Sequence, residues 1–286
     1  MPSQSRTSGN FVAIIKRYPV VTYFALAFTT SWAGALAVAA PHLARHEPLP
    51  KMTGILMFPA MLLGPSFAGI FLTRVVDGTN GLRDLFSRMF RWQVSLRWYA
   101  ALLIAPVLVL SVLFCLKVMV SPSYAPNRFL VGIFFGVPAG FLEEVGWMGF
   151  AFPKLCAQKN ALAASILLGL LWSGWHLPVI NYLGTATPRG GYWFHFFIAF
   201  ASAMTAMRVL IGWVYTNTTS VFLAQLIHVS STGSLVIFSP ANATARQEAM
   251  WYGFYSVVLW LAATVVIKVY GSRLIRTGIE ADSISL

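Results

Sequence analysis

Residues 129–152 read FLVGIFFGVPAGFLEEVGWMGFAF, an apolar run that is long enough to cross a membrane as one helix. It carries two adjacent carboxylates, Glu143 and Glu144. A charged side chain at membrane depth costs a few kcal/mol or more, so such residues are rare and mark functional sites. Only eight acidic residues occur in the whole chain, and the other six are expected in loops or tails. The stretch therefore predicts a membrane-embedded site, and other spans should supply partners for the pair.

The composition of the whole chain fits this interpretation. Of the 286 residues, 58% are hydrophobic and 10% are charged, whereas a soluble protein is nearer a quarter charged. Apolar runs of about 20 residues recur, which predicts an all-α, polytopic transmembrane helical bundle in a single domain, residues 1–286. A transmembrane barrel would instead show alternating strands of about ten residues. Eight spans are expected, at about residues 19–40, 53–72, 98–120, 129–152, 161–178, 193–215, 220–238 and 250–270.

The basic residues predict the orientation of this bundle. Eight spans place both termini on one side, where 13 of the 20 lysines and arginines fall; six lie on the opposite side, and Arg208 lies within a span. Because short cytoplasmic loops are rich in Lys and Arg, we expect both termini in the cytoplasm and the protein in a bacterial plasma membrane. The net charge of +12 is ascribed to these loops and to anionic lipid headgroups, and no nucleic-acid partner is expected.

Two segments have competing interpretations. Residues 81–98 interleave arginines with apolar side chains, which predicts a helix lying in the membrane interface; an ordinary cytoplasmic loop helix is the alternative. The first span has a signal peptide as its alternative, because residues 37–40 (AVAA) resemble a small-residue cleavage site. Its apolar stretch is long for that role and further spans follow, so a membrane span is preferred.

A glycine stripe leads to the carboxylates. Gly132, Gly136, Gly140 and Glu144 are each four residues apart, so they share one face of a helix. Glycines at this spacing let a neighbouring helix approach closely. Pro138 should kink the helix just before the glutamates, because it frees a backbone carbonyl. We therefore expect the carboxylates to face a crowded helix junction rather than lipid.

Two histidines are candidate partners for the carboxylates. His176 lies in LWSGWHLP, just before a proline, and His228 lies in LAQLIHVSST. Two imidazoles and two carboxylates suffice to polarise a water molecule and to protonate a leaving group. They would also suit a divalent metal such as zinc, although the His-Glu-x-x-His pattern of many metalloproteases is absent. The other three histidines (His42, His46 and His195) are interpreted as structural.

Arg208 is the remaining costly residue in a span. Its side chain would either extend to the cytoplasmic interface or pair with Glu143 or Glu144, which would offset the desolvation of both charges. Serine chemistry has little support, because no Gly-x-Ser-x-Gly pattern occurs, and glycine-rich phosphate loops are missing.

Three motifs in order resemble the CAAX-protease and bacteriocin-processing family of intramembrane endopeptidases, which includes Ras-converting-type CAAX prenyl proteases and abortive-infection proteins. They are the Glu143-Glu144 motif, Trp172-x-x-x-His176, and His228 after an apolar run; helices within 127–240 would carry them. The resemblance implies that Glu143 is a general base for water and that Glu144 orients it. It also implies that His176 assists or binds a metal and that His228 stabilises the oxyanion or completes the site.

The chain departs from the family pattern at three positions. The family motifs are Glu-Glu-x-x-x-Arg, Phe-x-x-x-His and His-x-x-x-Asn, whereas this chain has Met148, Trp172 and Thr232 at the Arg, Phe and Asn positions. The lost arginine matters most, because its charge would balance a second buried carboxylate. Our hypothesis is that Arg208 supplies that charge from another helix.

The leading functional prediction is an intramembrane endopeptidase that cuts a peptide bond near the membrane surface. Its partners would be the lipid bilayer and a protein or peptide substrate, with or without a lipid modification. One alternative is a catalytically inactive relative that serves in binding, immunity or scaffolding, for which Met148 and Thr232 argue. A second is a proton-coupled transporter with the carboxylates as proton carriers, but the sequence shows no internal repeat.

Overall fold

The computed structural model describes residues 12–186 and 189–275, and all regular secondary structure in these residues is helical. The predicted all-α class is therefore confirmed. The principal helices are α2 (Pro19–Ala44), α3 (Lys51–Val76), α4 (Gly78–Met89), α5 (Ile104–Met119), α6 (Ile133–Gly146), α7 (Phe152–Cys156), α8 (Ala161–Trp175), α9 (Leu177–Ala186), α10 (Trp193–Thr218), α11 (Val221–Phe238) and α12 (Ala245–Tyr270).

Seven helical segments within the described residues are long and apolar enough to cross a membrane. The fifth predicted span, 161–178, differs from the expectation: α8 has only 15 residues and ends at Trp175, and α9 starts at Leu177. Pro178 explains the break, because it lacks the N–H that would continue α8. His176 lies at this junction, between the end of α8 and the start of α9.

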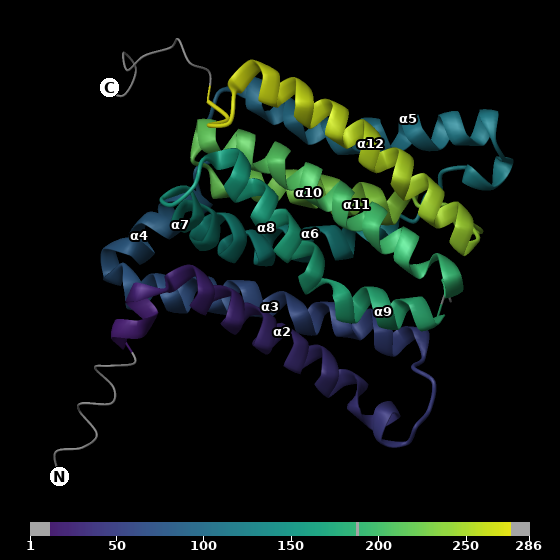
Figure 1. Cartoon of the computed structure of the whole chain (residues 1–286), viewed down its shortest axis with the longest axis horizontal. Helices are drawn as coiled ribbons and strands as arrows, with labels where there is room; N and C mark the ends of the chain where they lie inside the picture. The colour runs from purple at the N-terminus through teal and green to yellow at the C-terminus, as the bar shows by residue number, and fades with distance from the viewer. Residues whose placement is uncertain (1–11, 187–188, 276–286) are drawn as a thin grey trace.

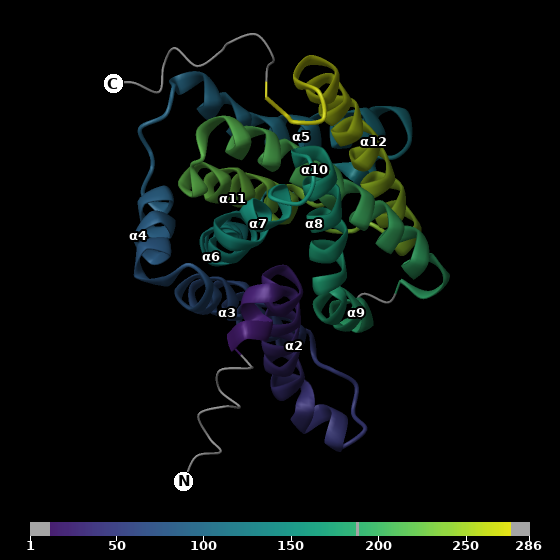
Figure 2. The ribbon, with the colours of Figure 1, turned by 60° about the vertical axis from the view of Figure 1, so that its left-hand side comes forward.

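The bundle has three tiers, which Figures 1 and 2 both show. Helices α6, α8, α10 and α11 lie in the middle, with α2 and α3 on one side and α5 and α12 on the other. In Figure 1, α2 begins and α12 ends at the left end of the bundle, beside α4 and α7, whereas α9 lies at the right end. We call the left end the terminal end and the right end the distal end.

The glycine stripe of α6 packs directly against α11, which confirms the predicted close approach of a neighbouring helix. A methyl group on Gly140 would lie 2.6 Å from the backbone oxygen of Gln225, and one on Gly136 would lie 3.0 Å from the Cα of Gly233. Both distances are shorter than van der Waals contact, so the close approach of these helices needs glycine. The stripe thereby brings the next residue on the same face, Glu144, against α11.

The helical turn after the carboxylates is wider than an α-helix. Residues Trp147–Ala151 form a short π-helix between α6 and α7. Such turns are rare and often occur at functional sites. Helix α3 crosses α6 at the same level, where a methyl group on Gly69 would lie 2.8 Å from the Cα of Gly146. The end of α6 is therefore held between α3 and α11.

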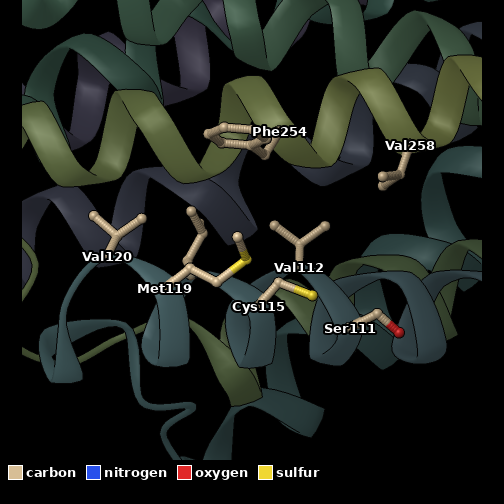
Figure 3. A pocket seen from close by; sticks show the side chains of 8 residues that line it. Ser111, Val112, Cys115, Met119, Val120, Phe254 and Val258 are labelled. Atoms are coloured by element: carbon tan, nitrogen blue, oxygen red, sulfur yellow. The ribbon is translucent and has the colours of Figure 1, made fainter.

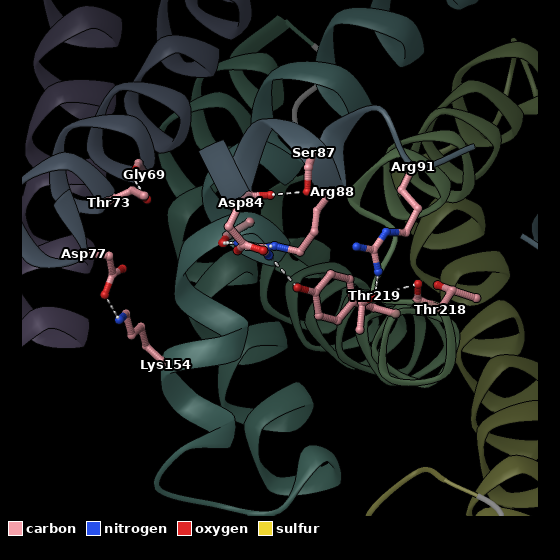
Figure 4. Close-up of polar contacts among 12 residues, drawn as sticks. Gly69, Thr73, Asp77, Asp84, Ser87, Arg88, Arg91, Lys154, Thr218 and Thr219 are labelled. Atoms are coloured by element: carbon pink, nitrogen blue, oxygen red, sulfur yellow. Dashed lines mark hydrogen bonds and ion pairs between the residues drawn. The ribbon is translucent and has the colours of Figure 1, made fainter. Parts of the chain in front are cut away.

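Helix α4 is shorter than the helix predicted for 81–98, so that prediction was wrong in its extent. It ends at Met89, and a separate 3-10 helix, Leu96–Leu103, leads into α5. Tertiary contacts explain the break: the Arg91 guanidinium donates to Thr219 (Figure 4). The Arg91 carbonyl accepts a hydrogen bond from Ser220. Nearby, Arg88 donates to Tyr215 at 2.6 Å, so both arginines contact protein.

Candidate active site

Glu144, Arg208 and His228 form one buried cluster from three helices. Arg208 Nη1 lies 2.8 Å from both carboxylate oxygens of Glu144, and His228 Nδ1 lies 2.7 Å from Glu144 Oε1. The side chains of Glu144 and Arg208 have no exposed surface, and that of His228 is 1% exposed. The hypothesis that Arg208 pairs with the second carboxylate is therefore confirmed.

This pairing explains how a second glutamate is tolerated inside the bundle. Each buried charge loses hydration worth several kcal/mol, and the opposite charge at contact distance offsets much of that cost. Arg208 also lies over the face of Trp172, with its Cζ 4.2 Å from the ring centroid, which adds a cation–π contact. The charge that the family pattern places at position 148 thus comes from α10, while Met148 is fully buried.

Glu143 has a different environment from its neighbour. Its Oε2 accepts hydrogen bonds from two indole N–H groups, Trp172 at 2.7 Å and Trp147 at 3.1 Å. Its Oε1 is buried and has no hydrogen-bond partner among the described residues. One oxygen of this carboxylate is therefore fixed, and the other keeps its lone pairs available.

Both candidate histidines have one ring nitrogen fixed. His176 Nδ1 lies 2.8 Å from the Trp172 carbonyl, which can only accept, so Nδ1 carries the proton. His228 Nδ1 donates in the same way to Glu144. The Nε2 atom of each ring is left for other chemistry, because these contacts set the tautomer and the orientation of the ring.

The side chain of Trp172 connects all these groups. Its ring centroid lies 5.2 Å from that of His176 and 5.1 Å from that of His228, both edge-to-face. The same indole donates to Glu143 and lies under Arg208. Three of the four candidate site residues from the sequence (Glu143, His176 and His228) therefore contact one residue, which the family pattern has as phenylalanine, and Glu144 joins them through His228 and Arg208.

A cavity of about 210 Å³ adjoins this cluster. His176 and Thr232 line it, and Thr232 lies one turn beyond His228 on α11. The volume suffices for several water molecules. The remaining lining side chains, mostly apolar, come mainly from the distal parts of the helices: Ile55, Phe58, Phe135, Val179, Phe200, Leu235, Val236 and Tyr252.

A second hollow lies between α5 and α12 and has a volume of about 280 Å³ (Figure 3). Apart from the Ser111 hydroxyl and the Cys115 thiol, its walls are hydrocarbon or thioether side chains, and none of the candidate site residues line it. It is therefore an apolar groove on the side of the bundle, and the cavity beside His176 is the better candidate for chemistry.

The residues around Glu143 do not fit a resident metal ion. Within residues 12–186 and 189–275, no three His, Cys, Asp or Glu side chains are placed to hold one. Zinc in enzymes takes three protein ligands, but Glu144 is engaged by Arg208 and His228, and the donors that remain available, Glu143 Oε1 and the two Nε2 atoms, are not placed to hold one ion together. The metal site that the sequence left open therefore has no support from the donor set.

Sequence reasoning missed the two tryptophans that hold Glu143. Trp147 follows Glu143 by four residues, which is the spacing at which helical side chains meet, and this signal was available. Trp172 was treated only as an aromatic replacement, although an indole carries an N–H that phenylalanine lacks. The hydrogen bond from Trp172 joins α8 to α6, so it became visible only in the tertiary structure.

Comparison with known proteins agrees with this arrangement. Residues 125–233 match the family described as Type II CAAX prenyl endopeptidase Rce1-like, and this segment contains all four candidate residues. The chain is also 28% identical over 191 residues to CAAX prenyl protease 2 of Methanococcus maripaludis, which covers 61% of this chain and 69% of the relative. Together with the ordered motifs, these matches show that the chain is similar to Rce1-like CAAX prenyl endopeptidases over its candidate site, and they support a membrane-embedded peptidase.

Proposed function

We propose that the chain hydrolyses a peptide bond with a water molecule that Glu143 activates next to His176, which alone among the four candidate residues lines the cavity. The observation that carries this proposal is the contrast between the two glutamates. Glu144 is paired with Arg208 and His228, whereas Glu143 keeps one oxygen that has no partner among the described residues. A general base needs such an available lone pair within reach of its proton donor.

The proposed reaction proceeds in two stages. Glu143 Oε1 takes a proton from water while the water oxygen attacks the carbonyl carbon of the scissile bond. The carbonyl oxygen becomes an oxyanion, for which His228 is the candidate stabilising group in its protonated form, because only the imidazolium carries an N–H at Nε2 as well as at Nδ1. The carbon–nitrogen bond then breaks, and the leaving nitrogen receives the proton from Glu143, directly or through His176. The products are a carboxylic acid and an amine, with no covalent intermediate on the protein.

Glu144 and Arg208 would position the reacting groups without touching them. Glu144 fixes the ring of His228 through Nδ1, so the opposite edge of that ring has a single orientation. Arg208 holds Glu144 through both carboxylate oxygens. The ion pair between these two side chains forms before substrate binds, so the site does not have to reorganise during the reaction.

The substrate is proposed to be a protein or peptide at the membrane that places an apolar segment in the cavity. Most of the side chains that line the cavity are apolar, with the exception of His176, Thr232 and Tyr252. The relative's name specifies a CAAX prenyl protease, so a lipid-modified substrate is one class to test. Unmodified peptides with apolar residues near the cut form the comparison class.

The direction of substrate entry follows from the position of the cavity. Most of its walls come from the distal parts of α3, α6, α10, α11 and α12, away from the end where α2 begins and α12 ends. The excess of basic residues argues that the terminal end faces the cytoplasm. We therefore propose that substrate reaches the site from the opposite face of the membrane.

The alternative of a catalytically inactive relative now rests on Thr232 alone. Its other support was Met148, and Arg208 supplies the missing charge. Thr232 is shorter than the family asparagine, but it lines the cavity and carries a hydroxyl.

The test is cleavage of a reporter peptide by the purified full-length protein in lipid nanodiscs. Glu143→Gln and His176→Ala should each lower the rate about 100-fold or more while the protein remains folded. Glu47→Gln changes an exposed carboxylate outside the site and should leave the rate unchanged. Cleavage that survives both site variants would refute the assignment. A pH-gradient-driven flux without cleavage would favour a transporter.

A further inference from the structure

The starting observation is that both hydrogen bonds to Glu143 reach the same oxygen. Trp172 from α8 and Trp147 from the π-helix donate to Oε2 at 2.7 Å and 3.1 Å. Both indoles are buried, with exposed fractions of 1% and 0%. Oε1 receives no donor from the described residues. The two oxygens of one carboxylate are therefore chemically distinct.

This asymmetry has a physical consequence for a buried carboxylate. A hydrogen bond to an ionised group is stronger than one between neutral groups, and its donor stabilises the charged form. Two donors on Oε2 also restrict the side-chain torsions of Glu143, which could otherwise adopt several rotamers. The lone pairs of Oε1 then point in one direction, and a general base needs that fixed geometry.

The charged side chains near Glu143 do not distinguish its two carboxylate oxygens. Arg208 and His228 contact the neighbouring Glu144. His176 directs its Nδ1–H to the Trp172 carbonyl. Among the described residues, the hydrogen bonds that reach Glu143 thus come from the two tryptophans.

We propose that Trp172 and Trp147 are positioning residues that clamp Oε2 of Glu143 and thereby select Oε1 as the oxygen that activates water. The inference rests on the proposed function, because it assumes that Glu143 is the general base. It goes beyond the family pattern, in which the position of Trp172 is phenylalanine, a residue that can fill the space but cannot donate. In this chain, the indole N–H adds a second donor to the one from Trp147.

If Trp172 only filled space, Trp172→Phe would have little effect on catalysis. Its ring packs against His176 and His228 and lies under Arg208, and phenylalanine would keep much of that stacking. Trp172→Phe therefore separates the N–H from the ring, and Trp147→Phe does the same for the other donor. Trp260→Phe is the matched control, because its indole donates to Ser202 between α12 and α10, outside the site.

The experiment measures the pH dependence of reporter cleavage by the full-length variants in nanodiscs. Trp172→Phe should lower kcat about 10-fold or more, with KM changed less than about twofold, because the bond to a charged group is lost. The acidic limb of the pH–rate profile should move to higher pH, since the carboxylate loses a donor that favours its ionised form. Trp147→Phe should show the same signs, and Trp260→Phe should match the parent protein.

A second measurement needs no activity. In a protein labelled with 15N-tryptophan, Glu143→Gln should shift the indole N–H signals of Trp147 and Trp172 but not that of Trp260. Unchanged signals would overturn the clamp even if a Phe variant failed to fold. A normal kcat and pH profile in Trp172→Phe, or a lower kcat with an unmoved acidic limb, would also overturn it. Cleavage that persists in Glu143→Gln would instead refute the proposed function.

Discussion

Arg208 and Glu144 lie 64 residues apart in the chain and meet at 2.8 Å inside the bundle, with no exposed surface on either side chain. The family pattern has an arginine at position 148, but this chain has methionine there, and α10 supplies the cation instead. This relationship makes the stability of the site depend on the packing of α10.

Removing the buried cation should destabilise the protein strongly. Arg208→Met should lower the free energy of unfolding by about 3–5 kcal/mol, because it leaves Glu144 charged and without its cation. Denaturant unfolding in detergent micelles measures this loss. Arg45→Met removes an exposed ion pair with Glu47 and should cost at most about 1 kcal/mol.

Two second substitutions should compensate for the loss of the Arg208 charge. Adding Glu144→Gln to Arg208→Met should recover part of the lost stability, since no uncompensated charge remains. Restoring the family residue, with Met148→Arg in the Arg208→Met background, should also recover part of it. If neither second change helps, the cost of Arg208→Met does not come from the unpaired carboxylate.

The two adjacent glutamates should respond differently to the same substitution. Glu143→Gln should abolish cleavage with little loss of stability, because the amide oxygen can still accept from the two indoles. Glu144→Gln should lower stability by several kcal/mol, because it leaves Arg208 buried without its counter-ion. Thermal unfolding of both variants beside their cleavage rates makes the comparison. Equal losses of stability would contradict the division of roles.

A methyl group on the glycine stripe should force α6 and α11 apart. Gly140→Ala should destabilise the protein by about 1–3 kcal/mol, because the added Cβ would lie 2.6 Å from the Gln225 carbonyl oxygen. It should also lower cleavage, since the contact between Glu144 and His228 bridges these helices. Gly253→Ala is the matched control: no atom lies within 4 Å of the new Cβ, and stability should stay the same or rise.

Chelation of divalent metal should leave cleavage intact. The described residues offer no group of three ligands, and Glu144 is bound to Arg208. Cleavage by protein treated with EDTA or 1,10-phenanthroline should therefore stay within about twofold of the untreated rate. Complete loss of activity that added zinc restores, with about one zinc per chain by elemental analysis, would contradict this expectation.

The orientation in the membrane can be measured with single cysteines. In a background with Cys115→Ala and Cys156→Ala, Arg246→Cys marks the distal end and Lys159→Cys the terminal end; both positions are exposed. A membrane-impermeant maleimide added to intact cells should label Arg246→Cys and leave Lys159→Cys unlabelled until the cells are lysed. The reverse pattern would place the cavity on the cytoplasmic side.

Much of the fold was predictable because membrane spans are local features. Continuous apolar runs predicted the helices, and the glycine spacing on residues 132–140 predicted the close packing that the structure confirms. Two helix ends were not predicted from the sequence: the end of α8 at Trp175 and the end of α4 at Met89. Both depend on contacts with other helices or on a single proline, and apolar content alone does not report them.

The sequence by itself determined that this is an all-helical membrane protein, and it singled out Glu143, Glu144, His176 and His228 as one candidate site, because charge inside an apolar run is costly wherever it occurs. Only the tertiary structure decided which carboxylate is neutralised and which keeps a free oxygen. That choice depends on how α6, α8, α10 and α11 are rotated about their axes, since a hydrogen bond needs atoms within about 3 Å. Periodicity along one helix carries no information on that rotation relative to its neighbours.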